Sequence, residues 1–567
     1  MSQFTSAGQV PGLAVKLWRG ERMCLIGMDV DDPEPDLVGF SIEVKSPGSP
    51  SFIPLRNRLN FSYDQPVAVA VNGYRNYLST QAPFQKFRWI HFPYEPKGGT
   101  YRYRVTKRHM PTDGHLVAGA ALTLDIPLDP AVYDGVLDVG FTRNFASSQA
   151  YADRYGNNPN VIPAKADDGL GFTKLPGDVY RWLGFEVYDL LFGFLDEVIA
   201  DPGLTLDVLA YDLNEPDIVR RLEQIGGRLR IIVDNSGTHA PAGSAESQAA
   251  KRLRVSAGSS RVKRTHFKGL QHHKVLIARR DGQPVKVLLG STNFSFRGLY
   301  IQANNALVFH GSDAAGLFGR VFDVAFKNPT HFGTDPLARQ WHLVQPTGAP
   351  PVHFCFSPHT DADLSLNPVG AAIDQATSSV FFAIAFLYQS WGTIRDAVDR
   401  LMKKQVFSYG ISDKRGSLEV KKPDGSIGLV DFAYLAGKAP EPFKTEWSGG
   451  AGINQHDKFV VTDFNLPTAK VFTGSSNLSP TGERGNGDNM VMIEDPRVAT
   501  AYTIEALRVF DHLHFRSRME DVLVKKKKTA VPLTLAKPTA ISGKPAWFAR
   551  SYLPGHAAEA DRKLFSS

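Results

Sequence analysis

Two short stretches of this sequence place histidine and lysine in the same arrangement at the start of an apolar run. The first reads QHHKVLIAR and contains His272 and Lys274, and the second reads QHDKFVVTD and contains His456 and Lys458. One such stretch alone is typical of a solvated strand end, where positive groups meet water. The spacing between the two histidines equals that between the two lysines. We therefore interpret the arrangement as a repeated functional feature.

A second polar motif follows each stretch at the same distance. GSTNFS contains Ser291 and Asn293, and GSSNLS contains Ser475 and Asn477. The polar positions of the two halves stay in register without a net insertion. Because self-similarity at a fixed offset is the signature of a duplicated structural unit, the sequence predicts two similar units that each supply one set of these residues.

These residue types suit the cleavage of a phosphodiester. Attack at phosphorus needs a nucleophile, an acid for the departing oxygen and donors for the non-bridging oxygens. One imidazole can attack phosphorus and form a phosphohistidine while the other protonates the leaving alcohol, since both titrate near neutral pH. The lysines lie two positions along the same strand face and add fixed positive charge, and the asparagine and serine side chains add neutral donors. We expect the two sets to close around one phosphate.

The remainder of the chain must position these groups, and its pattern changes along the sequence. Residues 1–150 consist of short alternating runs such as LAVKLW and TYRYRVT, separated by Pro, Gly and Asp turns. This pattern predicts an antiparallel β-sandwich in an accessory role. Beyond it, helical and strand patterns alternate, which predicts largely parallel or mixed sheets covered by helices on both faces.

The boundaries of the repeated units follow from composition. The Pro- and Gly-rich stretch HLVQPTGAPP separates a first unit at 175–340 from a second at 350–520. Residues 525–567 open with a lysine run and are rich in Pro, Ala and Lys, so we expect a loosely packed tail. The predicted fold class is α/β, with two similar α/β/α lobes preceded by the N-terminal β-sandwich.

Composition limits the classes of protein that fit. With 43% apolar and 21% charged residues over 567 positions, the chain is typical of a globular protein. Two cysteines cannot form a disulfide framework, and no secretory signal is visible, so we expect a cytoplasmic location. The longest apolar run is too short to cross a bilayer, which predicts no integral membrane segment. Because two lobes complete one site within a single chain, we expect a monomer.

The net charge of +7 is unevenly distributed along the chain. No acidic residue occurs from Ser247 to Arg280, a segment rich in lysine and arginine. A basic field beside the first motif is typical of a protein that binds a polyanion, although a solvated loop has the same composition. The candidate nucleic-acid contacts in this segment are Arg261, Lys263, Arg264 and Lys268.

HxK followed by GSxN, twice in one chain, resembles the phospholipase D superfamily, whose signature is HxKxxxxD with a downstream GSxN. The resemblance covers both predicted lobes. It implies two similar α/β lobes, a joint active site between them, a covalent phosphohistidine and no metal or other cofactor. It also implies that His272 is the nucleophile and His456 the acid. By this resemblance the catalytic residues are His272, Lys274, Asn293, His456, Lys458 and Asn477, with Ser291 and Ser475 as auxiliary donors.

Two positions depart from the family pattern. The second motif keeps its aspartate, Asp463, as an auxiliary or structural residue, but Arg279 stands at the matching position of the first motif. Asp488 stands where the family often places an acid that orients the catalytic histidine, whereas the first lobe has Asn304 there. Because a carboxylate raises the basicity of its imidazole, we expect Asp488 to make His456 the better-supported base.

Three functions fit these observations. The basic segment and the form of the GSxN motifs favour a nuclease, a metal-independent phosphodiesterase that acts on nucleic acid through a phosphohistidine. A phospholipase D or phosphatidyltransferase that acts on lipid head groups is the alternative, and it predicts an exposed apolar rim or interfacial helix that the sequence does not display. A phosphate-binding module without turnover is the third.

Overall fold

The computed structural model describes residues 3–62, 77–129, 133–144, 148–414, 422, 426, 428–431, 454–526 and 534–566. Within these ranges the chain has a mixed α/β fold in which the strands form four larger sheets and one two-stranded ribbon. No helix in the described part of the chain has both the length and the apolar character needed to cross a membrane.

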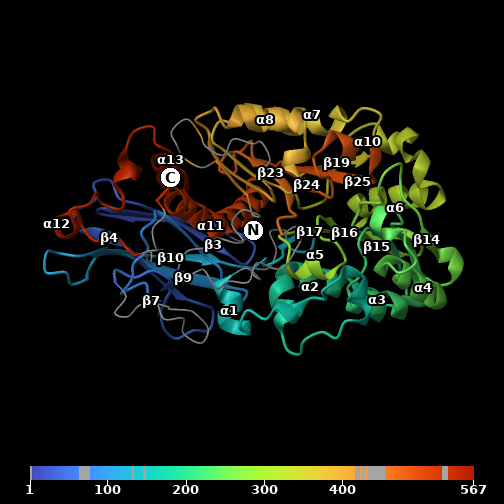
Figure 1. Ribbon diagram of the computed structural model, residues 1–567, viewed down its shortest axis with the longest axis horizontal. Coiled ribbons are helices and arrows are strands. Elements are labelled where there is room, and N and C mark those ends of the chain that lie inside the picture. Colours follow the sequence, from blue (N-terminus) through green and yellow to red (C-terminus); the bar gives the residue numbers. More distant parts are fainter. Residues whose placement is uncertain are drawn as a thin grey trace.

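The N-terminal region contains two four-stranded antiparallel sheets, coloured blue in Figure 1. The first has the order β1 (Thr5–Val10), β2 (Leu13–Arg19), β3 (Cys24–Asp29) and β8 (Arg88–His91). The second has the order β10 (Val117–Pro127), β9 (Thr100–His109), β4 (Leu37–Lys45) and β5 (Ile53–Pro54). The short strands β6 (Arg56–Asn57) and β7 (Tyr77–Leu78) pair separately.

Alternating side chains of these strands bury one shared core. Leu17 and Ile26 from the first sheet pack in the same cluster as Ile42 and Val105 from the second, and all four are fully buried. Period-two alternation directs one face of each strand inward, so the two sheets cover each other's apolar faces.

A seven-stranded sheet forms the next part of the chain. Its order is β11 (Leu137–Phe141), β17 (Asn305–His310), β16 (Gln283–Gly290), β15 (Val275–Arg280), β12 (Leu204–Ala210), β13 (Leu229–Val233) and β14 (Val262–Arg264). The neighbours β12, β13 and β14 run parallel, and the remaining neighbours are antiparallel. We call this sheet and its helices the first lobe.

An eight-stranded sheet follows, and we call it and its helices the second lobe. Its order is β18 (His342–Val344), β19 (Val352–Ser357), β25 (Asp488–Ile493), β24 (Lys470–Gly474), β23 (Lys458–Thr462), β20 (Ser379–Ile384), β21 (Phe407–Ser412) and β22 (Leu429–Asp431). The parallel run β20, β21 and β22 occupies the place that β12, β13 and β14 occupy in the first lobe, and the antiparallel order of the other strands corresponds as well.

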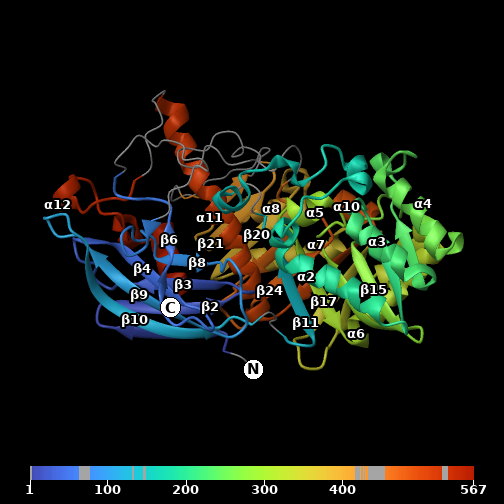
Figure 2. The ribbon, with the colours of Figure 1, turned by 90° about the horizontal axis from the view of Figure 1, so that it is seen from below.

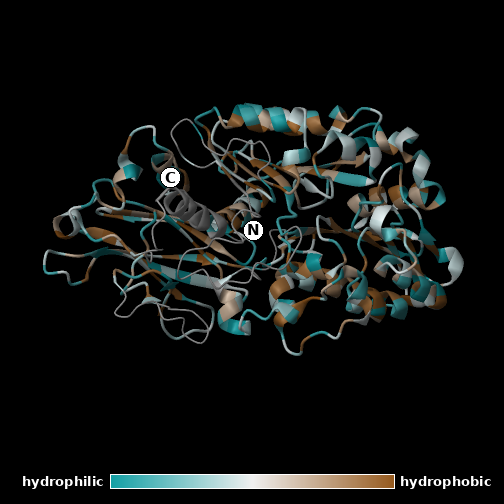
Figure 3. Cartoon of the chain, viewed as in Figure 1, coloured by the Kyte–Doolittle hydropathy of each residue, from teal (hydrophilic) through white to brown (hydrophobic). Residues whose placement is uncertain are grey.

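Helices cover the outer faces of both large sheets, and the inner faces share a core that also contains residues 314–325 and 498–510 of two further helices. The first lobe has α1 (Gln149–Tyr155), α2 (Val179–Ala200), α3 (Pro216–Ile225), α4 (Ala245–Ala257), α5 (Phe296–Tyr300) and α6 (Ser312–Lys327). The second has α7 (Asp363–Gln375), α8 (Thr393–Leu401), α10 (Pro480–Gly485) and α11 (Pro496–Lys526). Figure 1 shows the sheets between α2 and α3 on one side and α7 and α8 on the other. The α7 and α8 ribbons carry both hydrophilic and hydrophobic residues, as expected for helices that cover a sheet (Figure 3).

The structure differs from the sequence prediction in two places. Strand β11, within the predicted 1–150 domain, pairs with β17 and extends the first-lobe sheet. The expected loose tail is wrong for residues 534–566, which include α12 (Thr539–Ser542) and α13 (Ala557–Ser566). Phe565 is fully buried, its carbonyl accepts a 2.8 Å hydrogen bond from Nε1 of Trp18, and a side chain at Gly27 would collide with it. Figure 2 shows the C-terminus beside the N-terminal strands. Composition alone gave no sign of this packing, because it depends on a few aromatic residues.

Candidate active site

The two histidines of the HxK motifs stand immediately before equivalent strands of the two lobes. His272 precedes β15 and His456 precedes β23, and both are buried, with 3% and 5% of their surface exposed. The His272 amide donates to the carbonyl of Gly487 at 3.0 Å, and the His456 amide donates to the carbonyl of Ala303 at 3.2 Å. Each motif therefore pairs with backbone of the opposite lobe, which holds the two histidine segments at one lobe interface.

His272 is oriented by a carboxylate from the second lobe. Its Nδ1 lies 2.7 Å from Oδ1 of Asp488, and the Ser475 hydroxyl donates to the same oxygen at 2.7 Å. Because an ionised carboxylate only accepts hydrogen bonds, Nδ1 carries the proton and the Nε2 lone pair stays available. Burial disfavours ionisation of Asp488, but His272 and Lys274 outweigh it and hold the pKa of Asp488 below its usual value. Burial lowers the pKa of His272, and Asp488 opposes that shift.

His456 is oriented by an amide from the first lobe. Its Nδ1 lies 2.9 Å from Oδ1 of Asn304, and Ser291 donates to that oxygen at 2.9 Å. The Asn304 amide nitrogen donates to the Gly298 carbonyl at 2.9 Å, which fixes the direction of the amide. Nε2 of His456 lies 3.0 Å from Nζ of Lys458. Burial, followed by the charges of the nearby lysines, lowers the pKa of His456 well below its usual value.

The expectation that Asp488 supports His456 is therefore wrong. Asp488 and Asn304 each orient the histidine of the other lobe, so the carboxylate belongs to His272 and the amide to His456. Sequence offset alone could not reveal this exchange, because it arises from the pairing of each HxK segment with the opposite lobe.

Two buried lysines give the site a strong positive potential. Lys274 and Lys458 are each 1% exposed, and each donates to the carbonyl of the histidine two residues before it. Burial lowers the pKa of Lys274 to about 8, although Asp488 and Asp212 oppose the shift. Burial and then the charge of Lys274 lower the pKa of Lys458 well below its usual value. A bound anion would relieve this repulsion, so the arrangement suits a phosphate.

The GSxN motifs have a conformational role as well as a chemical one. Gly290 and Gly474 have φ of 145° and 128°, and a side chain on either would approach a backbone carbonyl oxygen to 2.5 or 2.4 Å. This close approach lets the hydroxyls of Ser291 and Ser475 accept a 3.0 Å hydrogen bond from the strand beside them while each donates to an orienting residue.

The two motif asparagines differ in their surroundings. Nδ2 of Asn293 donates to Oδ2 of Asp212 at 2.7 Å, and one of its two amide hydrogens remains for a ligand. Asn477 is half-buried, and its Oδ1 has no hydrogen-bond partner among the described residues. The Asn293 amide therefore retains a donor for a phosphate oxygen.

The structure adds a cluster around His239 that the sequence prediction missed. His239 Nδ1 lies 2.9 Å from Oδ2 of Asp234, and its Nε2 lies 3.1 Å from Oδ1 of Asp212 and 3.9 Å from Oε1 of Glu246. Burial disfavours the charged ring, but Asp212 and Asp234 outweigh it and raise the pKa of His239 to about 10. The ring centre of Tyr211 is 4.6 Å from that of His239 and 4.7 Å from that of His272. Polar residues directly after β12 and β13 were the available sequence signal.

Within the described part of the chain, this cluster is the one group of His, Cys, Asp and Glu side chains that could bind a metal ion together. The candidate ligand atoms of Asp212, His239 and Glu246 lie within 4.8 Å of one another. A charged imidazolium already balances these carboxylates, so the geometry is satisfied by ion pairing.

Asp463 and Arg279, which occupy the last position of the two HxK motifs, lie away from the histidines. Asp463 follows β23 and accepts hydrogen bonds from the backbone amides of residues 377–379 at the start of β20. Arg279, near the end of β15, donates to Asp207 at 2.6 Å and to the Gly319 carbonyl at 3.1 Å. Asp463 thus orients backbone and neither of the two histidines.

The predicted basic contacts divide into two groups. Arg261 and Lys268 are exposed. Lys263 donates to the Phe326 carbonyl, with Nζ 4.4 Å from the centre of that ring, and Arg264 donates to the His239 carbonyl. Lys263 and Arg264 are therefore each engaged within the first lobe, and their role as nucleic-acid contacts stays a prediction.

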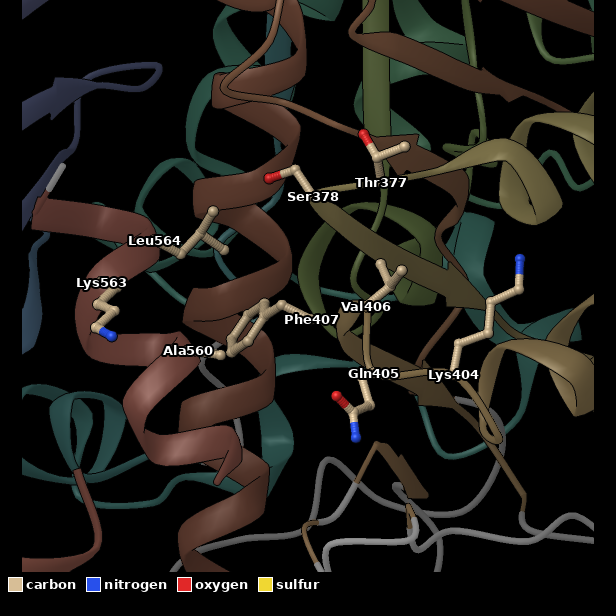
Figure 4. A pocket seen from close by; sticks show the side chains of 9 residues that line it. All are labelled: Thr377, Ser378, Lys404, Gln405, Val406, Phe407, Ala560, Lys563 and Leu564. Carbon is tan, nitrogen blue, oxygen red and sulfur yellow. The ribbon is translucent and has the colours of Figure 1, made fainter. Parts of the chain in front are cut away.

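A cavity of about 600 Å³ lies elsewhere, between the second lobe and α13 (Figure 4). Its lining includes Ser378, Phe407 and Lys563, and none of the catalytic candidates. It lies at the end of β23 that carries Asp463, away from His456. It is therefore distinct from the candidate active site.

Comparison with known proteins was made for the sequence and for the fold. A family model described as the PLD-like domain of cardiolipin synthase matches residues 197–325. A search of curated proteins found no match. Among solved structures, polyphosphate kinase from Porphyromonas gingivalis is similar at 12% identity and TM-score 0.39, over 77% of this chain and 66% of that one. Phosphatidylserine synthase from Haemophilus influenzae has 10% identity and TM-score 0.40, over 60% and 91%. The phospholipase D family member Nuc from Salmonella typhimurium has 22% identity and TM-score 0.19, over 24% and 85%.

The matched region begins in the last turn of helix α2 and includes the first HxK and GSxN motifs with their strands. The second lobe carries the same motifs on strands of the same order, and the residue before each motif histidine pairs with backbone of the opposite lobe. Residues 197–325 are therefore matched as a PLD-like domain, and this match supports the resemblance to the phospholipase D superfamily.

Proposed function

We propose that this protein is a metal-independent phosphodiesterase that cleaves nucleic acid through a phosphohistidine on His272. The observation that carries the proposal is the pair of buried histidines at the lobe interface, each held by a residue of the opposite lobe and flanked by a buried lysine. We further propose that the two lobes are halves of an internal duplication and that the N-terminal sheets form an accessory β-sandwich.

The first step transfers the phosphoryl group to the protein. Nε2 of His272 attacks phosphorus, an N–P bond forms and the P–O bond to the leaving alcohol breaks. His456 donates the proton on its Nε2 to that oxygen, so the alcohol leaves neutral. The ammonium groups of Lys274 and Lys458 and the amides of Asn293 and Asn477 donate to the non-bridging oxygens.

The second step releases the phosphate. His456, now neutral, takes a proton from water as the water oxygen attacks phosphorus and the N–P bond breaks. The product is a phosphomonoester, and His456 regains the proton that it lost in the first step. The complete cycle consumes one water molecule and restores both imidazoles.

The unequal partners of the histidines support this division of roles. A carboxylate beside Nδ1 raises the basicity and nucleophilicity of His272 and stabilises the positive charge that the ring acquires. An amide gives His456 no such support, so its imidazolium is a stronger acid. The negative charge of a bound phosphodiester counteracts the lysines and favours the protonated form of His456 before the first step.

Nucleic acid is the favoured substrate because exposed basic residues, Arg261 and Lys268, follow α4 on the same lobe as the first motif. Contacts to backbone phosphates would make binding depend strongly on salt and weakly on sequence. A phospholipid head group is the second candidate, since the same chemistry acts on any phosphodiester.

Turnover of labelled single-stranded DNA, RNA and phosphatidylcholine vesicles in excess EDTA tests the proposal. We expect cleavage of nucleic acid that resists EDTA and is lost in His272→Ala and His456→Ala. His115→Ala is the matched control, because His115 is exposed in the N-terminal region. Cleavage of vesicles alone would assign the lipid function, and turnover that EDTA abolishes would refute the mechanism.

A further inference from the structure

Aromatic rings extend from His456 toward the surface on one loop of the second lobe. The loop follows β20 and contains Phe386, Tyr388 and Trp391, which we call the aromatic rim. The ring centre of Phe386 lies 6.5 Å from that of His456 in an edge-to-face arrangement, and the ring centre of Tyr388 lies 6.4 Å from that of Phe386. Trp391 is 64% exposed. The rim thus connects a buried histidine with solvent.

Positive charge accompanies these rings. Nζ of the exposed Lys414 lies 5.8 Å from the centre of the Tyr388 ring, and the guanidinium carbon of Arg395 lies 5.1 Å from that of Trp391. The rim also borders the second GSxN motif, because a side-chain carbon on Gly392 would lie 3.8 Å from Cγ of Pro480, the residue that follows GSSNLS. Aromatic rings interleaved with basic groups form a stacking platform for single-stranded nucleic acid.

The corresponding loop of the first lobe has a different chemistry. Tyr211 follows β12 and packs on His272 as Phe386 packs on His456. The next residue in the first lobe is Asp212, which pairs with His239 and Asn293. A carboxylate on this side and the aromatic rim with its exposed Trp391 on the other make the two sides of the site unequal.

A membrane surface is a poorer partner for the rim than a nucleobase. Insertion into lipid needs a continuous apolar face. The other large apolar residues exposed in the described chain lie on other elements: Ile53, Tyr94, Val117, Val255, Leu343 and Leu553. An exposed tryptophan beside the guanidinium of Arg395, with Lys414 beside the neighbouring ring of Tyr388, has the composition of a base-stacking site.

We infer that the aromatic rim, and Trp391 in particular, binds the nucleobase on the leaving-group side of the scissile phosphate. The inference rests on the proposed function, in which His456 protonates the leaving alcohol. Because the rim begins with the ring that packs on His456, the nucleoside that departs with that alcohol lies on the rim side. The other nucleoside stays attached to the phosphoryl group on the side of His272 and Tyr211.

Dinucleoside monophosphates test this assignment because each contains one scissile bond. We propose to compare thymidylyl-thymidine with two analogues that lack the base on one side, and to identify the leaving nucleoside from the phosphorylated product. Loss of the leaving-side base should raise the KM of the unsubstituted protein about tenfold, the usual effect of one lost base stack. For Trp391→Ala, the KM for the intact dinucleotide should already be about tenfold higher than for the unsubstituted protein. Removal of the leaving-side base should not raise the KM of this variant further.

Matched variants and a small substrate separate the possible outcomes. Trp391→Phe should keep most of the affinity, Val255→Ala should change nothing, and kcat for methyl p-nitrophenyl phosphate should stay within twofold in all three variants. A KM that Trp391→Ala leaves unchanged would overturn the inference, as would an equal effect of either missing base. Weakened binding of Trp391→Ala to phosphatidylglycerol vesicles, with unchanged KM for the dinucleotide, would assign the rim to lipid and overturn it too.

Failure of the proposed function would be visible separately. If the unsubstituted protein turned over neither dinucleotides nor the small diester, the phosphodiesterase proposal would fail. Binding of fluorescent oligothymidylate would still test the rim. About tenfold weaker binding by Trp391→Ala than by Val255→Ala would support a base-stacking site, and equal binding would overturn it.

Discussion

Oδ1 of Asp488 in the second lobe lies 2.7 Å from Nδ1 of His272 in the first lobe. Neither lobe therefore contains both a candidate catalytic histidine and the residue that orients it. The same exchange places Asn304 of the first lobe on His456 of the second. The site is a property of the lobe interface, and the two histidines differ in that one is oriented by a carboxylate and the other by an amide.

The first prediction concerns this carboxylate. Asp488→Asn should lower kcat about a hundredfold, because an amide neither supports the basicity of His272 nor stabilises its positive charge. KM should change little, since Asp488 is buried behind the ring. Steady-state kinetics on a diester with a p-nitrophenyl leaving group measures the nucleophilic step without need of an acid.

Asn304→Asp is the matched substitution on the other histidine. On the p-nitrophenyl ester, Asn304→Asp should lose less activity than Asp488→Asn. On esters with alkyl leaving groups, Asn304→Asp should lose more activity than on the p-nitrophenyl ester, because a carboxylate makes the His456 imidazolium a weaker acid. Equal losses in the two variants on the activated ester would contradict the assignment of His272 as the nucleophile.

The second prediction concerns the alkaline limit of activity. The pKa of Lys274 is lowered to about 8, so its ammonium is present below that pH and is lost above it. In the free protein kcat/KM should therefore fall as the pH rises through about 8. Lys274→Arg should reduce activity near neutral pH and move the alkaline fall upward, since a guanidinium stays charged. An unchanged alkaline fall in this variant would show that another group titrates there.

The third prediction concerns stability around His239. The folded protein raises the pKa of His239 from 6.5 to about 10, so its contribution to stability is complete below pH 6.5 and is lost as the pH rises through 10. His239→Gln should lower the free energy of unfolding by about 3 kcal/mol at pH 6, because carboxylates are left without their buried counter-charge. Denaturant unfolding at several pH values should show this difference shrinking toward pH 10. If the difference in free energy of unfolding between the two proteins grew with pH, His239 would not be the charged group that stabilises the fold.

The fourth prediction separates structural from catalytic positions in the HxK motifs. Arg279→Ala should lower the free energy of unfolding by about 2 kcal/mol and leave kcat within twofold, because Asp207 is 2% exposed and keeps one partner, Arg230, at 2.7 Å. Asp463→Ala should likewise lower the free energy of unfolding and leave kcat within twofold, since the substitution removes the acceptor for backbone amides at the start of β20. Thermal unfolding and kinetics on the same samples check both. A tenfold loss of kcat with unchanged stability would make either residue part of the catalytic machinery.

The places of the candidate catalytic residues could be predicted from sequence because their motifs occur twice in register. His272, Lys274, His456 and Lys458 lie where equivalent strands begin, and this follows from the repeat alone. The partner of each histidine could not be predicted, because Asp488 and Asn304 reach across the lobe interface. Charge composition identified a basic segment, but it could not show that Lys263 and Arg264 are engaged within the first lobe.

The fold shows the same division between local and long-range information. Alternation predicted the N-terminal strands, yet it could not assign β11 to the first-lobe sheet, because a strand's neighbours are chosen by packing and not by its own pattern. Lysine-rich composition suggested a loose tail, whereas Phe565 and the close approach at Gly27 fix α13 against the N-terminal sheet.

The central claim is tested most directly by trapping the covalent intermediate. Methyl p-nitrophenyl phosphate should phosphorylate His456→Ala, because its leaving group needs no acid, and hydrolysis should then be slow because the base is missing. Mass spectrometry of the protein, kept at neutral or alkaline pH in EDTA, should locate a methyl phosphoryl group on His272 and none in His272→Ala. An adduct on another residue, or no adduct while the unsubstituted protein turns over the same ester, would contradict the account.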